Sequence, residues 1–221
     1  MRNYLRKLLY LLLVAGSFAV HADVTDDFFR AVRADNASGV KNLLSRGFDP
    51  NVRDPQGQTG LLIALREPSP KVIQVLLDSP KTDVEARNPK DESPLMLAAF
   101  KGQKDIVTRL IERDADINKP GWTPLHYAAT NGQVEIMKLL LDKDAFIDAE
   151  SPNGTTPLMM AAMYGSTAAV KLLLDEGADP LMKNQLGLSA VDFAQRANRP
   201  DAMEMIAAAV RAKKRPSDGK W

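Results

Sequence analysis

The sequence predicts an all-α repeat protein, a solenoid of about six helix-turn-helix repeats that include degenerate end caps. The first observation is self-similarity: TPLHYAATNGQVEIMKLLL, from Thr123, recurs 33 residues later as TPLMMAAMYGSTAAVKLLL, from Thr156. Related stretches start near residues 26, 59, 93 and 189, so the repeats fill most of residues 23–210. A fixed period of this length is typical of stacked structural repeats, which bury a core only against their neighbours.

The second observation is the same pair of helix signals in each repeat. In the fourth repeat, Thr123 is a good N-cap, and Pro124 occupies the first helical position, where no N–H is needed. Gly132 is placed to end this short helix in a left-handed conformation. Ile136 and Leu140 then belong to the apolar stripe of a second helix.

Departures from the pattern predict local differences. Asp35 occupies the turn-glycine position of the first repeat, and Pro68 occupies that position in the second. Since proline cannot adopt a positive φ, this turn must differ from the others, with Ser69 as the next N-cap. Ser93 and Thr123 are only 30 residues apart, so three residues are missing from the connection that ends at Trp122.

These residues resemble the ankyrin repeat, whose pattern includes Thr-Pro-Leu-His-x-Ala-Ala, a glycine, a Val-x-x-Leu-Leu run and Gly-Ala-Asp. The resemblance implies helix pairs joined by β-turn loops, here called fingers, and a concave face that binds other proteins. It also implies that the ring of His126 bonds backbone groups and joins adjacent turns. Similar exported bacterial proteins act in oxidative-stress defence or neutralise toxins, and the resemblance does not choose between these roles.

The residue inventory argues against an enzyme. His126 is the only histidine after residue 22 and cysteine is absent, so zinc sites with nitrogen or sulfur ligands and nucleophilic triads lack their residues. We therefore expect no catalytic residue, no metal and no cofactor. One alternative stays open, a small exported hydrolase that uses carboxylates on the repeat scaffold. Four aspartates recur at the Gly-Ala-Asp turn and are interpreted as structural: Asp49, Asp83, Asp116 and Asp179.

Residues 1–22 have the order of a secretory signal peptide. Three bases precede a 13-residue apolar run from Leu8 to Val20, and small residues precede Asp23. The run is shorter than the roughly 20 residues that span a bilayer. We expect cleavage after Ala22, export to a bacterial periplasm and no stable membrane anchor. A eukaryotic secretory origin stays open, because acceptor triplets begin at Asn36 and Asn153.

Charge gives little sign of a nucleic-acid partner. Three of the 29 bases lie in the signal peptide, which leaves 26 bases against 28 acids. Residues 211–221 lose the apolar period and are predicted to form a basic flexible tail. We expect a monomer that has no nucleic-acid partner and no stable membrane anchor. The alternative is that the basic tail binds nucleic acid or lipid.

Carrying over the family's variable contact positions gives a candidate partner-binding set. Basic residues in its first half favour a protein with an acidic patch, and bulky residues in its middle resemble interface anchors. Loss of three finger residues predicts a notch with Trp122 at its base, flanked by Phe100 and Tyr164. The alternative is a solvated face in which these rings only cover core edges. The set comprises Arg66, Arg87, Lys90, Phe100, Lys101, Trp122, Asn131, Met163 and Tyr164.

Overall fold

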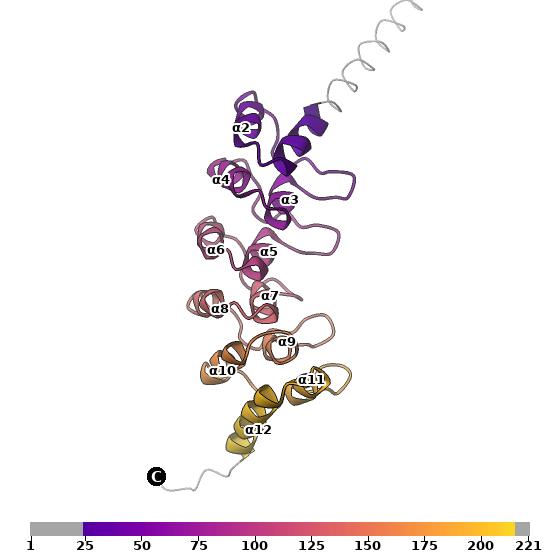
Figure 1. The fold of residues 1–221 in the computed structure, drawn as a ribbon, viewed down its shortest axis with the longest axis vertical. Coiled ribbons are helices and arrows are strands. Elements are labelled where there is room, and N and C mark those ends of the chain that lie inside the picture. Colours follow the sequence, from indigo (N-terminus) through magenta and orange to yellow (C-terminus); the bar gives the residue numbers. More distant parts are fainter. Residues whose placement is uncertain (1–23, 215–221) are drawn as a thin grey trace, which may run out of the picture. The chain divides into compact units, whose positions relative to one another are not determined.

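The computed structural model describes residues 24–214, and these form helices joined by loops (Figure 1). A helix over residues 24–33 comes first, followed by eleven more, which pair in chain order into six repeats. Within 24–214 there is no β-strand, only isolated bridges. The all-α repeat prediction is therefore confirmed. The helices are α2 (Ala37–Ser45), α3 (Gly60–Arg66), α4 (Pro70–Asp78), α5 (Pro94–Lys101), α6 (Lys104–Ile111), α7 (Pro124–Thr130), α8 (Val134–Leu141), α9 (Pro157–Met163), α10 (Thr167–Asp175), α11 (Ala190–Arg196) and α12 (Pro200–Lys214).

The chain divides into two compact units, Met1–Asp91 and Glu92–Trp221. In the N-terminal unit, the core includes Phe28, whose ring lies 5.2 Å from Phe29 and 4.8 Å from Phe48, centroid to centroid. Gly60 allows this packing, because a Cβ there would come within 2.6 Å of the Phe28 ring. The predicted signal peptide lies outside the described residues.

Asp35 and Ser69 show how the N-terminus of α4 is capped in the irregular second repeat. Asp35 has a positive φ of 49°, which aspartate tolerates better than most residues, and its Oδ1 accepts the N–H of Val72 at 2.9 Å. Ser69 stands at the N-cap of α4 as expected, but its side chain makes no capping bond. The carboxylate of the preceding repeat supplies that cap. The predicted difference at Pro68 is also present, since Glu67 leaves α3 with an extended ψ of 157°.

In the C-terminal unit, the first helices α5, α7, α9 and α11 stack in one row, and α6, α8, α10 and α12 follow in a second (Figure 1). Thr123 caps α7 and Thr156 caps α9, each followed by proline at the first helical position. Gly132 has a φ of 65°, so the predicted left-handed end of α7 is confirmed. Gly165 serves a different purpose: a Cβ there would lie 2.3 Å from the carbonyl oxygen of Ala129.

The predicted flexible tail begins too early. α12 continues through Arg211 to Lys214, because its alanine-rich turns favour the helix and Lys213 Nζ pairs with Asp179 Oδ1 at 2.7 Å. The rest of that tail, 215–221, lies outside the described residues. Within 24–214, no helix has the length and apolar character needed to cross a bilayer.

Candidate functional site

An apolar socket of about 200 Å³ opens in the C-terminal unit, beside the predicted notch. Phe100 comes from the end of α5, Tyr127 and Thr130 from α7, Met160 from α9, and Trp122 from the finger that precedes α7. Phe100 and Trp122 belong to the predicted set, whereas Tyr127 and Met160 were missed. The sequence alone did not show which way their side chains would face.

The finger before α7 is shorter than those before α9 and α11 (Figure 1). The two longer fingers close by backbone pairing: Ser151 N–H donates to Thr155 O and Asn184 N–H to Leu188 O, both at 3.0 Å. The short finger is held by a side chain instead. Lys119 Nζ donates to the carbonyl oxygens of Pro120 at 3.1 Å and Trp122 at 3.0 Å.

Lys119 is only 1% exposed, which the sequence did not predict. Lysine is almost never fully buried unless its ammonium is paired, and here the finger's own carbonyls are among its partners. The bond to Trp122 O fixes the backbone of the short finger at Trp122. Lys119 therefore positions Trp122 without itself lining the socket.

The walls of the socket are held in place by contacts behind them. Trp122 packs edge-on to His126 with ring centroids 5.2 Å apart, and Phe100 packs edge-on to Tyr127 at 6.3 Å. The two hydroxyl groups of the lining already have acceptors: Tyr127 OH donates to Glu92 Oε1 at 3.1 Å, and Thr130 Oγ1 donates to the carbonyl of His126 at 2.7 Å. The socket therefore presents mainly ring and aliphatic surface.

His126 is fully buried and joins two repeats. Its Nε2 lies 2.9 Å from Thr155 O and must donate that bond, so Nδ1 is free to accept from Thr123 N–H at 3.2 Å. Burial lowers the pKa of His126 from 6.5 to about 4, which keeps the ring neutral near pH 7. This geometry is the structural role that the resemblance implied, with both ring nitrogens occupied.

The recurring aspartates also have structural partners. In each case one carboxylate oxygen accepts the backbone N–H two residues later, at 2.8–3.0 Å. Lys213 holds the pKa of Asp179 below its usual range, while burial raises the pKa of Asp148. No group of three or more potential metal ligands exists within residues 24–214. The four that make this turn bond are Asp49, Asp83, Asp116 and Asp179.

The other predicted contact residues divide between the two units. Arg66, Arg87 and Lys90 belong to the N-terminal unit, where Arg87 pairs with Asp91 at 3.3 Å. In the C-terminal unit, Asn131 Nδ2 donates to Phe100 O at 2.8 Å and thereby supports the rim of the socket. Lys101, Met163 and Tyr164 stand at helix ends outside the lining, and Tyr164 is 59% exposed.

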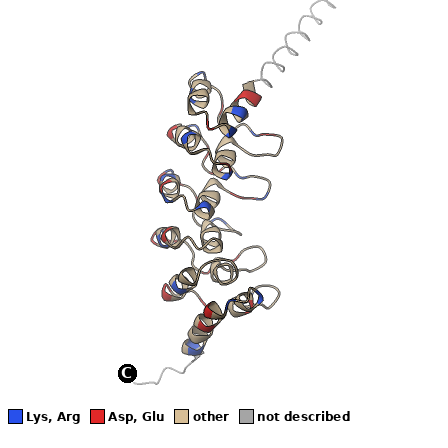
Figure 2. Cartoon of the chain, in the orientation of Figure 1, with Lys and Arg blue, Asp and Glu red and all other residues tan. Residues whose placement is uncertain are grey.

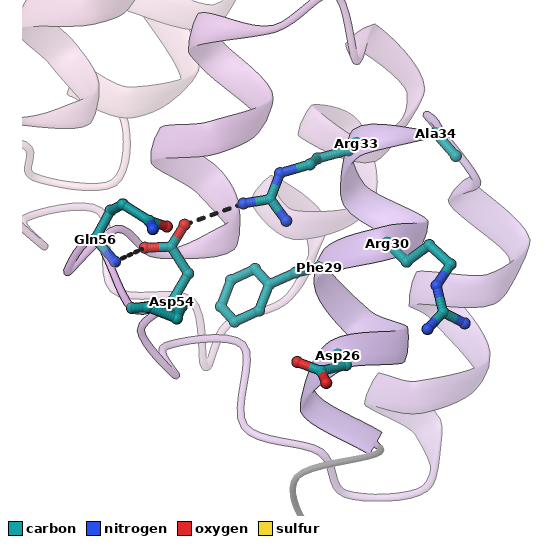
Figure 3. A pocket seen from close by; sticks show the side chains of 8 residues that line it. Asp26, Phe29, Arg30, Arg33, Ala34, Asp54 and Gln56 are labelled. Atoms are coloured by element: carbon teal, nitrogen blue, oxygen red, sulfur yellow. Dashed lines mark hydrogen bonds and ion pairs between the residues drawn. The ribbon is translucent and has the colours of Figure 1, made fainter.

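A second, more polar cleft of about 640 Å³ lies in the N-terminal unit (Figure 3). Arg33 donates to Asp54 Oδ2 at 3.0 Å, and its guanidinium carbon lies 5.8 Å from the centroid of the Phe29 ring. Arg30 pairs with Asp27 at 2.7 Å. Positive charge in this region is therefore largely matched by neighbouring acids, which reduces the net attraction for an acidic partner.

Charge is unevenly distributed among the helices of the C-terminal unit. α7 and α9 contain no charged residue, whereas α6, α8 and α10 each carry both signs (Figure 2). The helices that supply most of the socket thus form an uncharged surface. A protein of this kind, with stacked helix pairs and an uncharged socket on one row, belongs to the class of helical repeat proteins that bind partners.

The family follows from comparison with known proteins. The family model for ankyrin repeats in three copies matches residues 28–120, 71–151, 117–184 and 146–216, so the chain belongs to the ankyrin-repeat family. Members of this family bind other proteins, and the matching model is not that of an enzyme family. The ankyrin expectation from the sequence is confirmed.

Curated relatives match only part of this chain. It is 38% identical over 86 residues to neurogenic locus notch homolog protein 4 of Homo sapiens, and 36% identical over 88 residues to notch homolog protein 1 of Xenopus laevis. These matches cover 39% and 40% of this chain. The aligned part spans only 4% of the length of each relative.

Two bacterial structures match over most of the chain. One comes from the complex of the predatory endopeptidase Bd0816 of Bdellovibrio bacteriovorus with the immunity protein Bd3460. It has a TM-score of 0.71 at 27% identity, covering 86% of this chain and 98% of that chain. The other is an ankyrin repeat domain of Acinetobacter baumannii, with a TM-score of 0.69 at 24% identity, covering 83% of this chain and 97% of that one. The second match concerns the fold alone.

Proposed function

We propose that this protein is an exported, non-catalytic binding protein that neutralises an enzyme by binding to it. The observation that carries the proposal is the match to the immunity protein and endopeptidase complex, which extends over nearly the whole of the matched chain. The other role considered from the sequence, defence against oxidative stress, has no comparable support.

The chemistry of the chain is consistent with a binding role. Its only histidine after residue 22 is buried and neutral, and the recurring aspartates hold backbone turns. The uncharged surface of α7 and α9 contains a preformed apolar socket. In protein–protein interfaces, a few residues buried in central pockets of this kind supply most of the binding energy. We place the main partner contact at this socket.

Location and the nature of the partner complete the proposal. The signal-peptide pattern of residues 1–22 favours action in the periplasm. We propose that the chain acts there as a monomer. An acidic patch on the partner would face the N-terminal unit, where Lys90 is exposed and takes part in no ion pair within residues 24–214. Because neighbouring acids pair with several of the arginines, we expect this charge attraction to affect the association rate more than the affinity.

The test is inhibition of a captured enzyme. The mature chain, immobilised, is incubated with periplasmic extract of the source organism, and each retained enzyme is purified and assayed with and without added chain. We expect one hydrolytic enzyme to lose activity in proportion to the chain added, up to one equivalent. Retention without any change in activity would leave a binding protein but contradict neutralisation.

A further inference from the structure

We infer that the socket receives one large uncharged side chain, of the leucine, methionine or phenylalanine kind, carried on a protruding loop of the partner. This inference rests on the proposed function, in which the partner is a protein. It goes further because it states the chemistry of the group that enters. Size, polarity and one available hydrogen-bond donor each support it.

The volume fits a side chain better than a cofactor. The socket holds about 200 Å³, whereas sites for drug-sized ligands typically hold about 300–1,000 Å³. Its walls come from three successive first helices and one finger, so they are fixed by the repeat packing. A loop can enter because the finger beside Trp122 lacks the three residues that its counterparts have.

The polarity of the lining disfavours a charged occupant. Both hydroxyl groups of the lining donate to acceptors within the protein, to Glu92 from Tyr127 and to the His126 carbonyl from Thr130. Helices α7 and α9 carry no charge of either sign (Figure 2), and Lys101, which follows Phe100 on α5, is exposed and lies outside the lining. A lysine or glutamate side chain placed here would lose water and find the hydroxyl groups of the lining already bonded, whereas an apolar side chain only gains by leaving water.

Trp122, a lining residue, carries an indole N–H that can donate a hydrogen bond. Its indole Nε1–H finds no acceptor in the part of the chain that the structure describes. A backbone carbonyl beside the entering side chain would supply that acceptor. This favours a peptide loop over a simple hydrocarbon, because a buried donor without a partner weakens binding.

The experiment uses model side chains and the indole signal of Trp122. The chain has two tryptophans, so a Trp221→Phe variant leaves a single indole N–H resonance in the nitrogen–proton correlation spectrum. The amides of N-acetyl-leucine, N-acetyl-lysine and N-acetyl-glutamate are titrated in turn. We expect the leucine amide to shift this resonance with an affinity about tenfold or more above those of the charged amides, from its apolar burial.

Two further variants locate the effect. Met160→Glu places a carboxylate in the lining and should abolish the response to the leucine amide. Leu186→Glu makes the same change at an exposed leucine outside the lining and should preserve it. Equal responses to all three amides, no saturable response, or a response that survives Met160→Glu would each overturn the inference. Melting curves of both variants check that they fold.

Binding of the natural partner separates the two proposals. If a captured enzyme is inhibited equally by the unmodified chain and by Met160→Glu, neutralisation stands and the socket inference is wrong. If the leucine amide binds at Trp122 but no enzyme is inhibited, the socket binds apolar groups and the proposed function is wrong.

Discussion

The imidazole Nε2 of His126 lies 2.9 Å from the carbonyl oxygen of Thr155, 29 positions along the chain. This bond joins the first helix of one repeat to the finger that precedes the next. Because the ring is fully buried, its loss leaves two backbone groups without their partner. His126 therefore connects two adjacent repeats, and replacing it should lower the stability of the protein.

We expect His126→Gln to lower the free energy of unfolding by about 1–2 kcal/mol, the scale of one lost buried hydrogen bond. Partner binding per folded molecule should stay unchanged. Urea unfolding and affinity measured on the same preparation test this. A variant with unchanged stability but no binding would show that His126 contacts the partner.

Stability should also depend on pH through His126. In the unfolded chain the imidazole has its ordinary pKa of 6.5, while burial lowers the pKa in the folded protein to about 4. The unfolded state therefore binds the extra proton, and stability present above pH 6.5 is lost as the pH falls towards 4. From pH 7 to pH 5 the loss should be about 2 kcal/mol.

The matched control for this pH dependence is His126→Gln, which keeps every carboxylate. Between pH 7 and pH 5 its free energy of unfolding should fall by about 2 kcal/mol less than that of the unmodified chain. Parallel curves for the two proteins would contradict a lowered pKa at this residue.

Trp122→Ala should weaken binding of the partner by about 2 kcal/mol or more, as expected for a central anchor. Lys90→Ala should have a much smaller effect, because Lys90 is exposed. Leu125→Ala serves as the folding control, since deleting a buried leucine costs about 2–5 kcal/mol of stability. If Trp122→Ala lowers the melting temperature as much as Leu125→Ala while affinity stays constant, the ring only packs on the solenoid.

Lys119→Met should destabilise the protein by about 1–3 kcal/mol, because the carbonyls of Pro120 and Trp122 lose a buried donor. The indole resonance of Trp122 should broaden or shift as its backbone loosens. Lys101→Met is the matched control at an exposed position, with an expected change within about 0.5 kcal/mol. Equal stability of the two variants would show that the finger does not depend on the ammonium group.

Export makes a separate prediction. Expressed with residues 1–22 in a bacterium, the chain should be recovered from the periplasm with Asp23 as its first residue, as read by N-terminal sequencing or intact mass. The reason is the length of the apolar run: 13 residues are typical of a cleaved signal peptide and too few to span a bilayer. Membrane-bound protein that retains Met1 would contradict it.

The sequence predicted the fold well because the repeats carry the same local signals. The structure shows the expected cap at Thr123, followed by Pro124 at the first helical position. It also shows the left-handed Gly132 that ends the helix. Such signals act within a few residues, so one sequence is enough to read them. The cap of α4 could not be predicted in this way, because Asp35 supplies it from 37 residues away.

The candidate site was only partly predictable, for the same reason. A deletion in the finger is visible in the repeat spacing, and it led to Trp122 and Phe100. The inward faces of Tyr127 and Met160 depend on how neighbouring helices pack. Burial of Lys119 runs against the usual preference of lysine for water and follows from carbonyls exposed by the deletion.

The short finger also suggests how recognition diverges among repeat proteins over evolution. Three residues are lost between Asn118 and Gly121, yet α7 keeps its capping threonine and its buried leucine, and α8 follows in the usual position. Because each repeat packs only on its neighbours, a change of loop length alters the surface without disturbing the core. Insertions and deletions in fingers can therefore give a lineage new partners while the scaffold sequence is conserved by selection for stability.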